Sequence, residues 1–150
     1  MSTLDIYYET KETKELFPEK RVKVIVKKIL ALLKRSESEL SLSFVSGKTI
    51  KELNRDYRNK DESTDILSFS QQSDFQIGQK ELLGDLIISV DDLKDNSNYF
   101  SVDLEEELIR LLIHGILHLT GWDHQSNNSD EQMLIYQEQL LALVRKESGE

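Results

Sequence analysis

The segment from Leu108 to His124 constrains the fold of this chain more than any other part of it. It holds all three histidines, and most of its other residues are apolar. Burying polar rings without partners costs free energy, so the rings of a buried histidine helix need a dedicated partner. The apolar residues of the run are Leu108, Ile109, Leu111, Leu112, Ile113, Ile116, Leu117 and Leu119.

The spacing of the histidines predicts a metal site. His114 and His118 are four residues apart, so on a helix they lie on one face. Gly121 is a helix stop, because glycine accepts a left-handed backbone without steric cost, and the chain can then bring His124 back toward the first two. With no cysteine in the chain, His, Asp and Glu remain as ligands. Three imidazoles with a fourth position open to water are typical of catalytic zinc, so we expect one zinc ion per chain, although nickel, iron and copper also suit such ligands.

One position in the histidine segment bears on the reaction. Metzincin peptidases share this spacing, but a glutamate follows their first histidine and acts as general base. Here the position is Gly115, which has no side chain to move a proton. A zinc metallopeptidase-like hydrolase is therefore an alternative that the missing glutamate argues against. Gly115 also suits close packing of the helix against a strand.

Chain length and charge limit the number of domains, the compartment and the binding partners to be expected. The length of 150 residues predicts a single domain over residues 1–150. Because of the histidine segment, we expect it to be a metal-dependent hydrolase domain. No signal-peptide pattern and no membrane-length apolar run are found, so we expect a cytoplasmic protein without membrane contact. The formal net charge of -9 opposes binding of nucleic acid by the molecule as a whole. Basic residues crowd the first quarter, and from charge alone a solvated helix face explains them better than an anionic partner.

Periodicity predicts an α+β fold. Strands are expected near residues 4–8, 40–44, 66–69 and 82–90, and a loop over residues 70–80. Helices are expected over 19–35, from a capping box of Thr49 and Glu52 through Tyr57, and over 91–96. The histidine helix is expected to begin near Ser101 or Asp103 and to carry His114 and His118, and Ser129 and Gln132 are expected to cap a last helix. The last helix carries Met133, Tyr136, Leu140 and Val144 on one face. We therefore expect a small mixed four-stranded sheet covered by helices, with the histidine helix in the core.

Four sequence blocks resemble one family in order and spacing. Residues 114–124 resemble the H-G-x-L-H-L-x-G-[YW]-D-H signature of the bacterial rRNA maturation factor YbeY family. Residues 53–58 are similar to its L-N-x-x-Y-R, residues 64–69 to its T-D-V-L-S-F, and residues 83–86 to its L-G-D-I. Ser70 stands where a proline often follows, and Trp122 replaces the commoner tyrosine. The resemblance covers nearly the whole chain.

The resemblance implies a function and a set of site residues. It implies a single-strand-specific, metal-dependent endoribonuclease that matures the 3′ end of small-subunit ribosomal RNA and serves ribosome quality control. The implied partners are single-stranded RNA and the small ribosomal subunit, with no DNA expected. His114, His118 and His124 correspond to the metal ligands, usually of zinc, and Arg58 to the catalytic arginine. A non-catalytic, metal-stabilised ribosome-assembly factor is the remaining alternative, and the net acidity is its best argument.

The proton chemistry stays open at the level of sequence. Arg58 offers a planar cation suited to phosphate oxygens. Asp123 can accept a proton or cap the turn after Gly121, and Asp65 and Asp85 are expected near strand ends as partners of ligand N–H groups. Either water or the 2′-hydroxyl of the substrate serves as nucleophile.

Overall fold

Strands and helices follow one another along the chain in the order that the sequence predicts, with one helix added. The computed structural model describes residues 4–71, 81–122 and 127–147. The elements are β1 (Leu4–Tyr8), α1 (Lys11–Leu16), α2 (Glu19–Leu32), β2 (Glu39–Val45), α3 (Gly47–Arg58), β3 (Ile66–Ser70), β4 (Leu82–Ser89), α4 (Val90–Phe100), α5 (Leu104–Leu119) and α6 (Asn127–Glu147). None of these helices is both long and apolar enough to cross a membrane.

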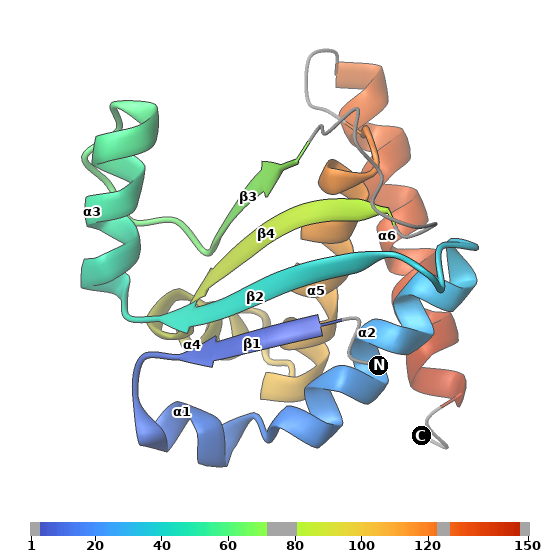
Figure 1. Ribbon diagram of the computed structural model, residues 1–150, viewed down its shortest axis with the longest axis horizontal. Coiled ribbons are helices and arrows are strands. Elements are labelled where there is room, and N and C mark those ends of the chain that lie inside the picture. Colours follow the sequence, from blue (N-terminus) through green and yellow to red (C-terminus); the bar gives the residue numbers. More distant parts are fainter. Residues whose placement is uncertain (1–3, 72–80, 123–126, 148–150) are drawn as a thin grey trace.

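The four strands form one mixed sheet in the order β1-β2-β4-β3 (Figure 1). β1, β2 and β4 are parallel, and β3 runs antiparallel to β4, with Ile66 opposite Ile88 and Ser70 opposite Gly84. β3 is therefore an edge strand. The predicted α+β class with a mixed four-stranded sheet is confirmed.

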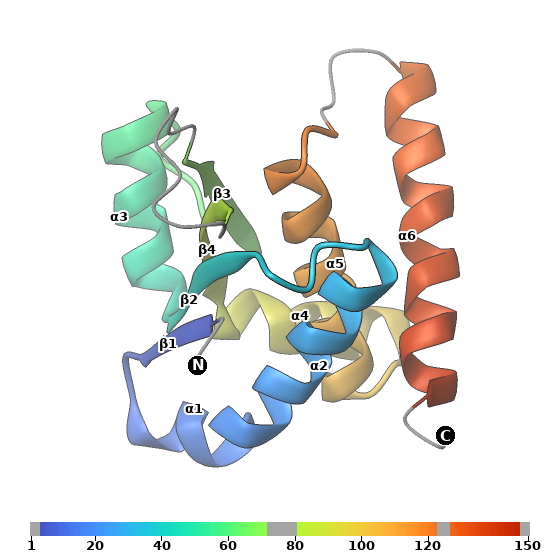
Figure 2. The same ribbon diagram turned by 45° about the vertical axis from the view of Figure 1, so that its right-hand side comes forward.

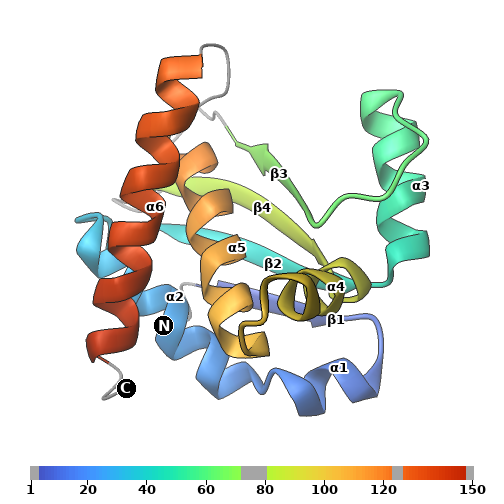
Figure 3. The same ribbon diagram turned by 180° about the vertical axis from the view of Figure 1, so that it is seen from behind.

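Different helices pack on the two faces of the sheet. Leu86 and Ile88 of β4 belong to the main core with α5, whereas Leu67 of β3 packs in a smaller cluster with Ile50 of α3. Side chains alternate across a strand, so β3 contributes to both clusters: Ile66 packs against the main core, and Leu67 belongs to the smaller cluster. Seen from behind, α5 crosses the face of the sheet, α6 lies outside it, and α3 stands at the β3 edge (Figure 3).

Helix α5 is the centre of the core, as the sequence predicts. Asp103 caps it by accepting a hydrogen bond from the Glu106 N–H at 2.7 Å, and its acidic first turn suits the positive end of the helix dipole. Leu112, Ile113 and Ile116 are fully buried. Burial of each such side chain contributes about 1.5–3 kcal/mol, so α5 is held firmly in place.

Several predicted boundaries were wrong. Helix α1 was not predicted, because its six residues contain too few apolar positions for a period. Helix α3 is capped by Ser46, which accepts from Thr49 N–H at 3.1 Å, so the predicted cap was three residues late. Helix α4 runs beyond residue 96 to Phe100, and α6 begins before Ser129. Most of the predicted loop, residues 72–80, lies outside the described residues.

Candidate functional site

A cavity of about 580 Å³ lies between β3 and the C-terminal half of α5. The two elements face each other, with α6 on the outer side of α5 (Figure 2). The wall from α5 supplies His114 and His118, the turn after it supplies Trp122, and α3 supplies Arg58. The remaining wall is built from Thr64, Asp65, Ile66, Ser68, Ser70 and Leu119.

The two histidines of α5 point their Nε2 atoms at each other. The His114 and His118 Nε2 atoms are 3.0 Å apart, and the ring centroids are 4.6 Å apart with the planes 77° from parallel. Two ligands of a tetrahedral zinc ion, each at 2.0–2.1 Å, lie about 3.3 Å apart. The observed separation is close to that value, so the pair fits a shared metal ion.

The other nitrogen of each ring is bonded to an acceptor. His118 Nδ1 lies 2.9 Å from the Trp122 carbonyl oxygen, and His114 Nδ1 lies 2.7 Å from Gln137 Oε1. A carbonyl oxygen only accepts, so each Nδ1 donates a proton, and a ring in its neutral form then presents a lone pair at Nε2. Two lone pairs that face each other at 3.0 Å repel unless a proton or a metal ion is shared between them. The tautomers therefore suit a metal ion.

The turn after α5 explains the partner of His118. Gly121 has a positive φ of 109°, as predicted for a helix stop. The Trp122 N–H then donates to Leu117 O at 3.1 Å, which folds the chain back over the helix end. This turn brings the Trp122 carbonyl to His118. The residues that end the helix therefore also orient the His118 imidazole.

The third predicted ligand, His124, lies outside the described residues, and so does Asp123, the predicted base or cap. Among the side chains that the structure does describe, no three His, Asp or Glu residues are grouped to hold a metal ion. Assignment of His124 as a ligand therefore stays a prediction from sequence.

Arg58 reaches the cavity from the last turn of α3. Asn59 ends this helix in the left-handed conformation, at φ 55°, a role that suits asparagine. One turn earlier, the buried Asn54 donates from Nδ2 to the Glu62 carbonyl at 3.0 Å. This bond ties the segment that leads to the cavity wall at Thr64 back to the helix that carries Arg58.

The two candidate aspartates have different surroundings. Asp65 lines the cavity, and its Oδ2 accepts a hydrogen bond from Asn96 Nδ2 at 3.1 Å. Asp85 accepts from Ser41 Oγ and lines a separate cavity of about 140 Å³. The next residue, Leu86, packs toward α5, so Asp85 points the other way. The Nδ1 atoms of His114 and His118 bond to Gln137 and to the Trp122 carbonyl, so the prediction that Asp65 or Asp85 orients a ligand is not met at these two histidines.

Gly115 faces the sheet and not the cavity. A Cβ on this residue would lie 2.6 Å from Leu86 Cδ2 and 2.8 Å from Ile66 Cδ1. The predicted close packing of the helix against a strand is confirmed. This also explains why the position cannot carry a catalytic glutamate in this fold.

Sequence reasoning missed Gln137, the acceptor for His114. Gln137 is 5% exposed and lies on the face of α6 that buries Met133, Leu140 and Val144. A polar residue within that apolar stripe was the available signal, because a buried amide needs a partner.

Comparison with known proteins agrees with this geometry. The family described as "Endoribonuclease YbeY" matches residues 7–145. Endoribonuclease YbeY of Treponema denticola is 41% identical over 124 residues, which covers 81% of this chain and 80% of the relative. The protein of the same name from Sulfurihydrogenibium sp. is 43% identical over 116 residues, covering 77% and 75%.

A solved structure is similar over almost the full length. The solution structure of TM1509 from Thermotoga maritima matches with a TM-score of 0.67 and 28% identity, over 96% of this chain and 90% of that chain. The fold, the paired histidines and the sequence matches agree, and the chain belongs to the endoribonuclease YbeY family.

Proposed function

We propose that this chain is a zinc-dependent endoribonuclease that cleaves single-stranded RNA in the cavity between β3 and α5. One observation carries the proposal: two imidazole nitrogens that face each other at 3.0 Å share a cavity with a guanidinium group. Imidazole is a preferred zinc ligand, and the guanidinium fork matches phosphate oxygens. A metal site and a phosphate site therefore adjoin.

His114, His118 and His124 would hold one zinc ion. When bound, zinc lowers the pKa of a coordinated water to about 7 or polarises a phosphoryl oxygen. Gln137 and the Trp122 carbonyl keep the Nδ1 protons of the two described ligands away from the ion, since both are acceptors at hydrogen-bond distance. Such outer contacts commonly orient metal-bound histidines.

The remaining cavity residues suit an RNA backbone. Arg58 would bind the scissile phosphate and stabilise the charge that develops on it. Thr64, Ser68 and Ser70 line the cavity, and their hydroxyls can bond to ribose and phosphate oxygens. Asp65 is held by Asn96 at 3.1 Å, and its carboxylate is our candidate for accepting the proton of the attacking hydroxyl.

The peptidase alternative is not favoured. Its general base would have to stand at position 115, which packs against Leu86 and Ile66 of the sheet. The family matches are to endoribonucleases.

The biological substrate in this proposal is ribosomal RNA. Relatives are named as endoribonucleases, and the resemblance of the sequence blocks points to the 3′ end of small-subunit RNA, in the cytoplasm. Co-sedimentation of the protein with the small subunit tests the association with ribosomes separately from cleavage.

Purified protein with added zinc, incubated with unstructured RNA, DNA of the same sequence and an unstructured peptide, tests the activity. We expect cleavage of RNA alone. His114→Ala should abolish it, and Arg58→Ala should lower kcat/KM by about 10²-fold or more. Arg55→Ala is the matched control, because Arg55 is an exposed arginine in the same helix turn, paired with Asp56 at 3.3 Å. Full cleavage by His114→Ala would refute the proposed site, and stoichiometric zinc without cleavage would support an assembly factor instead.

A second measurement identifies the nucleophile. A single 2′-deoxy substitution at the cleaved nucleotide blocks the reaction if the neighbouring 2′-hydroxyl attacks, and leaves it intact if water attacks.

A further inference from the structure

A continuous series of hydrogen bonds runs behind His114, on the side away from the cavity. It begins with Gln137 of α6, whose Oε1 lies 2.7 Å from His114 Nδ1 and whose Nε2 donates to Glu138 Oε2 at 3.2 Å. Gln137 is 5% exposed, so water gives it few alternative partners. Both ends of this amide therefore have defined contacts.

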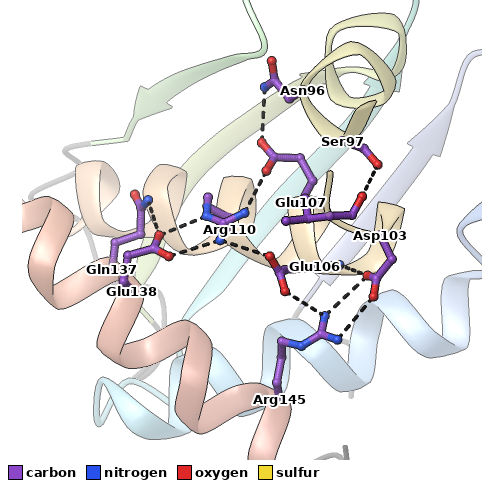
Figure 4. A network of polar contacts seen from close by, with 10 residues as sticks. Asn96, Ser97, Asp103, Glu106, Glu107, Arg110, Gln137, Glu138 and Arg145 are labelled. Atoms are coloured by element: carbon purple, nitrogen blue, oxygen red, sulfur yellow. Dashed lines mark hydrogen bonds and ion pairs between the residues drawn. The ribbon is translucent and has the colours of Figure 1, made fainter. Parts of the chain in front are cut away.

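Arg110 holds Glu138 in place. Its Nε donates to Glu138 Oε2 at 3.0 Å and its Nη2 to Oε1 at 3.1 Å (Figure 4). Such a paired contact between guanidinium and carboxylate fixes orientation as well as distance. Arg110 is fixed in turn by Glu107, which accepts from Nη1 at 2.9 Å and is 2% exposed.

The Glu138 carboxylate determines which end of the amide meets the histidine. A carboxylate only accepts, so it binds the NH₂ group of Gln137 and turns the carbonyl oxygen toward His114 Nδ1. If the amide were flipped, its NH₂ would face Nδ1, and the ring proton would move to Nε2. A protonated Nε2 has no lone pair for a metal ion.

We propose that Glu138 and Arg110 are positioning residues that fix the tautomer of His114 through Gln137. Neither residue lines the cavity. They act by keeping the Gln137 amide in the one orientation that leaves His114 Nε2 able to bind metal. The inference rests on the proposed function for the role of the metal, but the tautomer is a property of the protein without metal.

The surrounding charges explain why a neutral amide, and not a carboxylate, accepts the hydrogen bond from His114. The Arg110 guanidinium already contacts Glu106, Glu107 and Glu138. A carboxylate at position 137 would accept from His114 as well, but it would add one more negative charge beside Glu138 and lose the NH₂ donor. We therefore expect Gln137→Glu to keep the tautomer and to lower the stability of the fold.

Nitrogen NMR of the imidazole rings tests the proposal. The chain has 3 histidines, so long-range ¹H–¹⁵N spectra of the metal-free protein at about pH 8, above the usual histidine pKa, are simple to assign. We expect His114 to carry its proton on Nδ1 in the wild type and in Gln137→Glu. In Gln137→Leu and Glu138→Leu we expect a mixture with the Nε2-protonated form.

Zinc affinity gives the second readout, by competition with a chromophoric chelator. We expect Gln137→Leu to weaken zinc binding about 10–100-fold, as loss of such outer contacts does in other proteins, and Glu138→Leu to weaken it less. Gln139→Leu, at an exposed position on the same helix, is the matched control and should change neither readout.

Two results would overturn the proposal. One is an unchanged His114 tautomer in Glu138→Leu, whatever Gln137→Leu shows. The other is a shifted tautomer with unchanged zinc affinity. Glu138 is 51% exposed in its side chain, so Glu138→Leu should fold even if the buried Gln137→Leu does not, and circular dichroism checks this. Because the tautomer is read without metal or RNA, its outcome is separable from failure of the proposed nuclease activity.

Discussion

Gly115 of α5 lies directly against Leu86 of β4, with no room for a methyl group between them. A Cβ at position 115 would approach Leu86 Cδ2 to 2.6 Å. This contact sets the distance between the histidine helix and the sheet, and so the width of the cavity next to it.

We predict that Gly115→Ala destabilises the protein even though alanine is the better helix former. Overpacking a core costs about 1–3 kcal/mol, against a gain in helix propensity of about 1 kcal/mol. The net loss in the free energy of unfolding should be up to about 2 kcal/mol, measured in urea. Gly47→Ala is the control, because its Cβ would meet an exposed Asp91 carboxylate at 3.2 Å. Equal or greater stability of Gly115→Ala would show that the helix can move away freely.

Zinc should stabilise the protein against heat and denaturant. A ligand that binds only the folded state at 100 times its Kd adds about 2.7 kcal/mol, so free zinc at that level should raise the Tm by several degrees. His118→Ala should remove the effect, because it deletes one of the two facing nitrogens. Magnesium, which prefers oxygen ligands, should have no such effect. Equal stabilisation of His118→Ala by zinc would place the binding site elsewhere.

Stability should depend on pH through Glu107. Burial, with a smaller contribution from the Asp65 charge, raises the pKa of this carboxyl above its ordinary value of 4.5. The folded protein thus keeps a proton that the unfolded chain releases. The stability that this provides is complete below pH 4.5 and is lost as the pH rises through the raised pKa. We expect the free energy of unfolding of Glu107→Gln, relative to wild type, to increase from pH 4 to 7.

Glu138 should give a pH dependence of stability opposite to that of Glu107. Its hydrogen bonds with Arg110 lower the pKa of the Glu138 carboxyl, so its contribution to stability is present above the ordinary pKa and is lost as the pH falls. Relative to wild type, Glu138→Gln should therefore become less stable as the pH rises. Parallel pH profiles for the two glutamine variants would contradict both assignments.

Asn54 should affect the reaction without touching the cavity. Asn54→Ala removes the bond to the Glu62 carbonyl, and loss of such a buried partner costs about 1–3 kcal/mol. The segment between Arg58 and Thr64 should then loosen, so we expect a higher KM for RNA. Glu52→Ala, at an exposed position of the same helix, is the control. An unchanged KM would show that Arg58 is held by other contacts.

The sequence predicted what depends on local pattern. The alternation of apolar and polar residues over 4–8 is the period of a single strand. The spacing of His114 and His118 is the period of a single helix, and Gly121 ends that helix through its backbone preference. Those predictions hold in β1 and α5, including the end of α5 at Gly121.

What the sequence did not predict depends on packing between distant elements. The contact of His114 with Gln137 joins α5 to α6, and no period within either helix encodes it. The direction of Asp85 depends on which face of β4 meets α5, and a strand buried on both faces does not reveal this in its composition. Helix α1 is short and polar, and it forms because Thr10 caps it and Phe17 packs in the core beyond it.

The position of Gln137 on the helix that follows the histidines has a consequence for synthesis of the protein. Translation delivers His114 and His118 before α6, so a nascent chain can fold the sheet and α5 while the acceptor for His114 is still in the ribosome. Until α6 docks, the contact between His114 Nδ1 and Gln137 Oε1 is absent. If Gln137 fixes the tautomer as we propose, His114 Nε2 becomes able to bind a metal ion only when this last described helix docks.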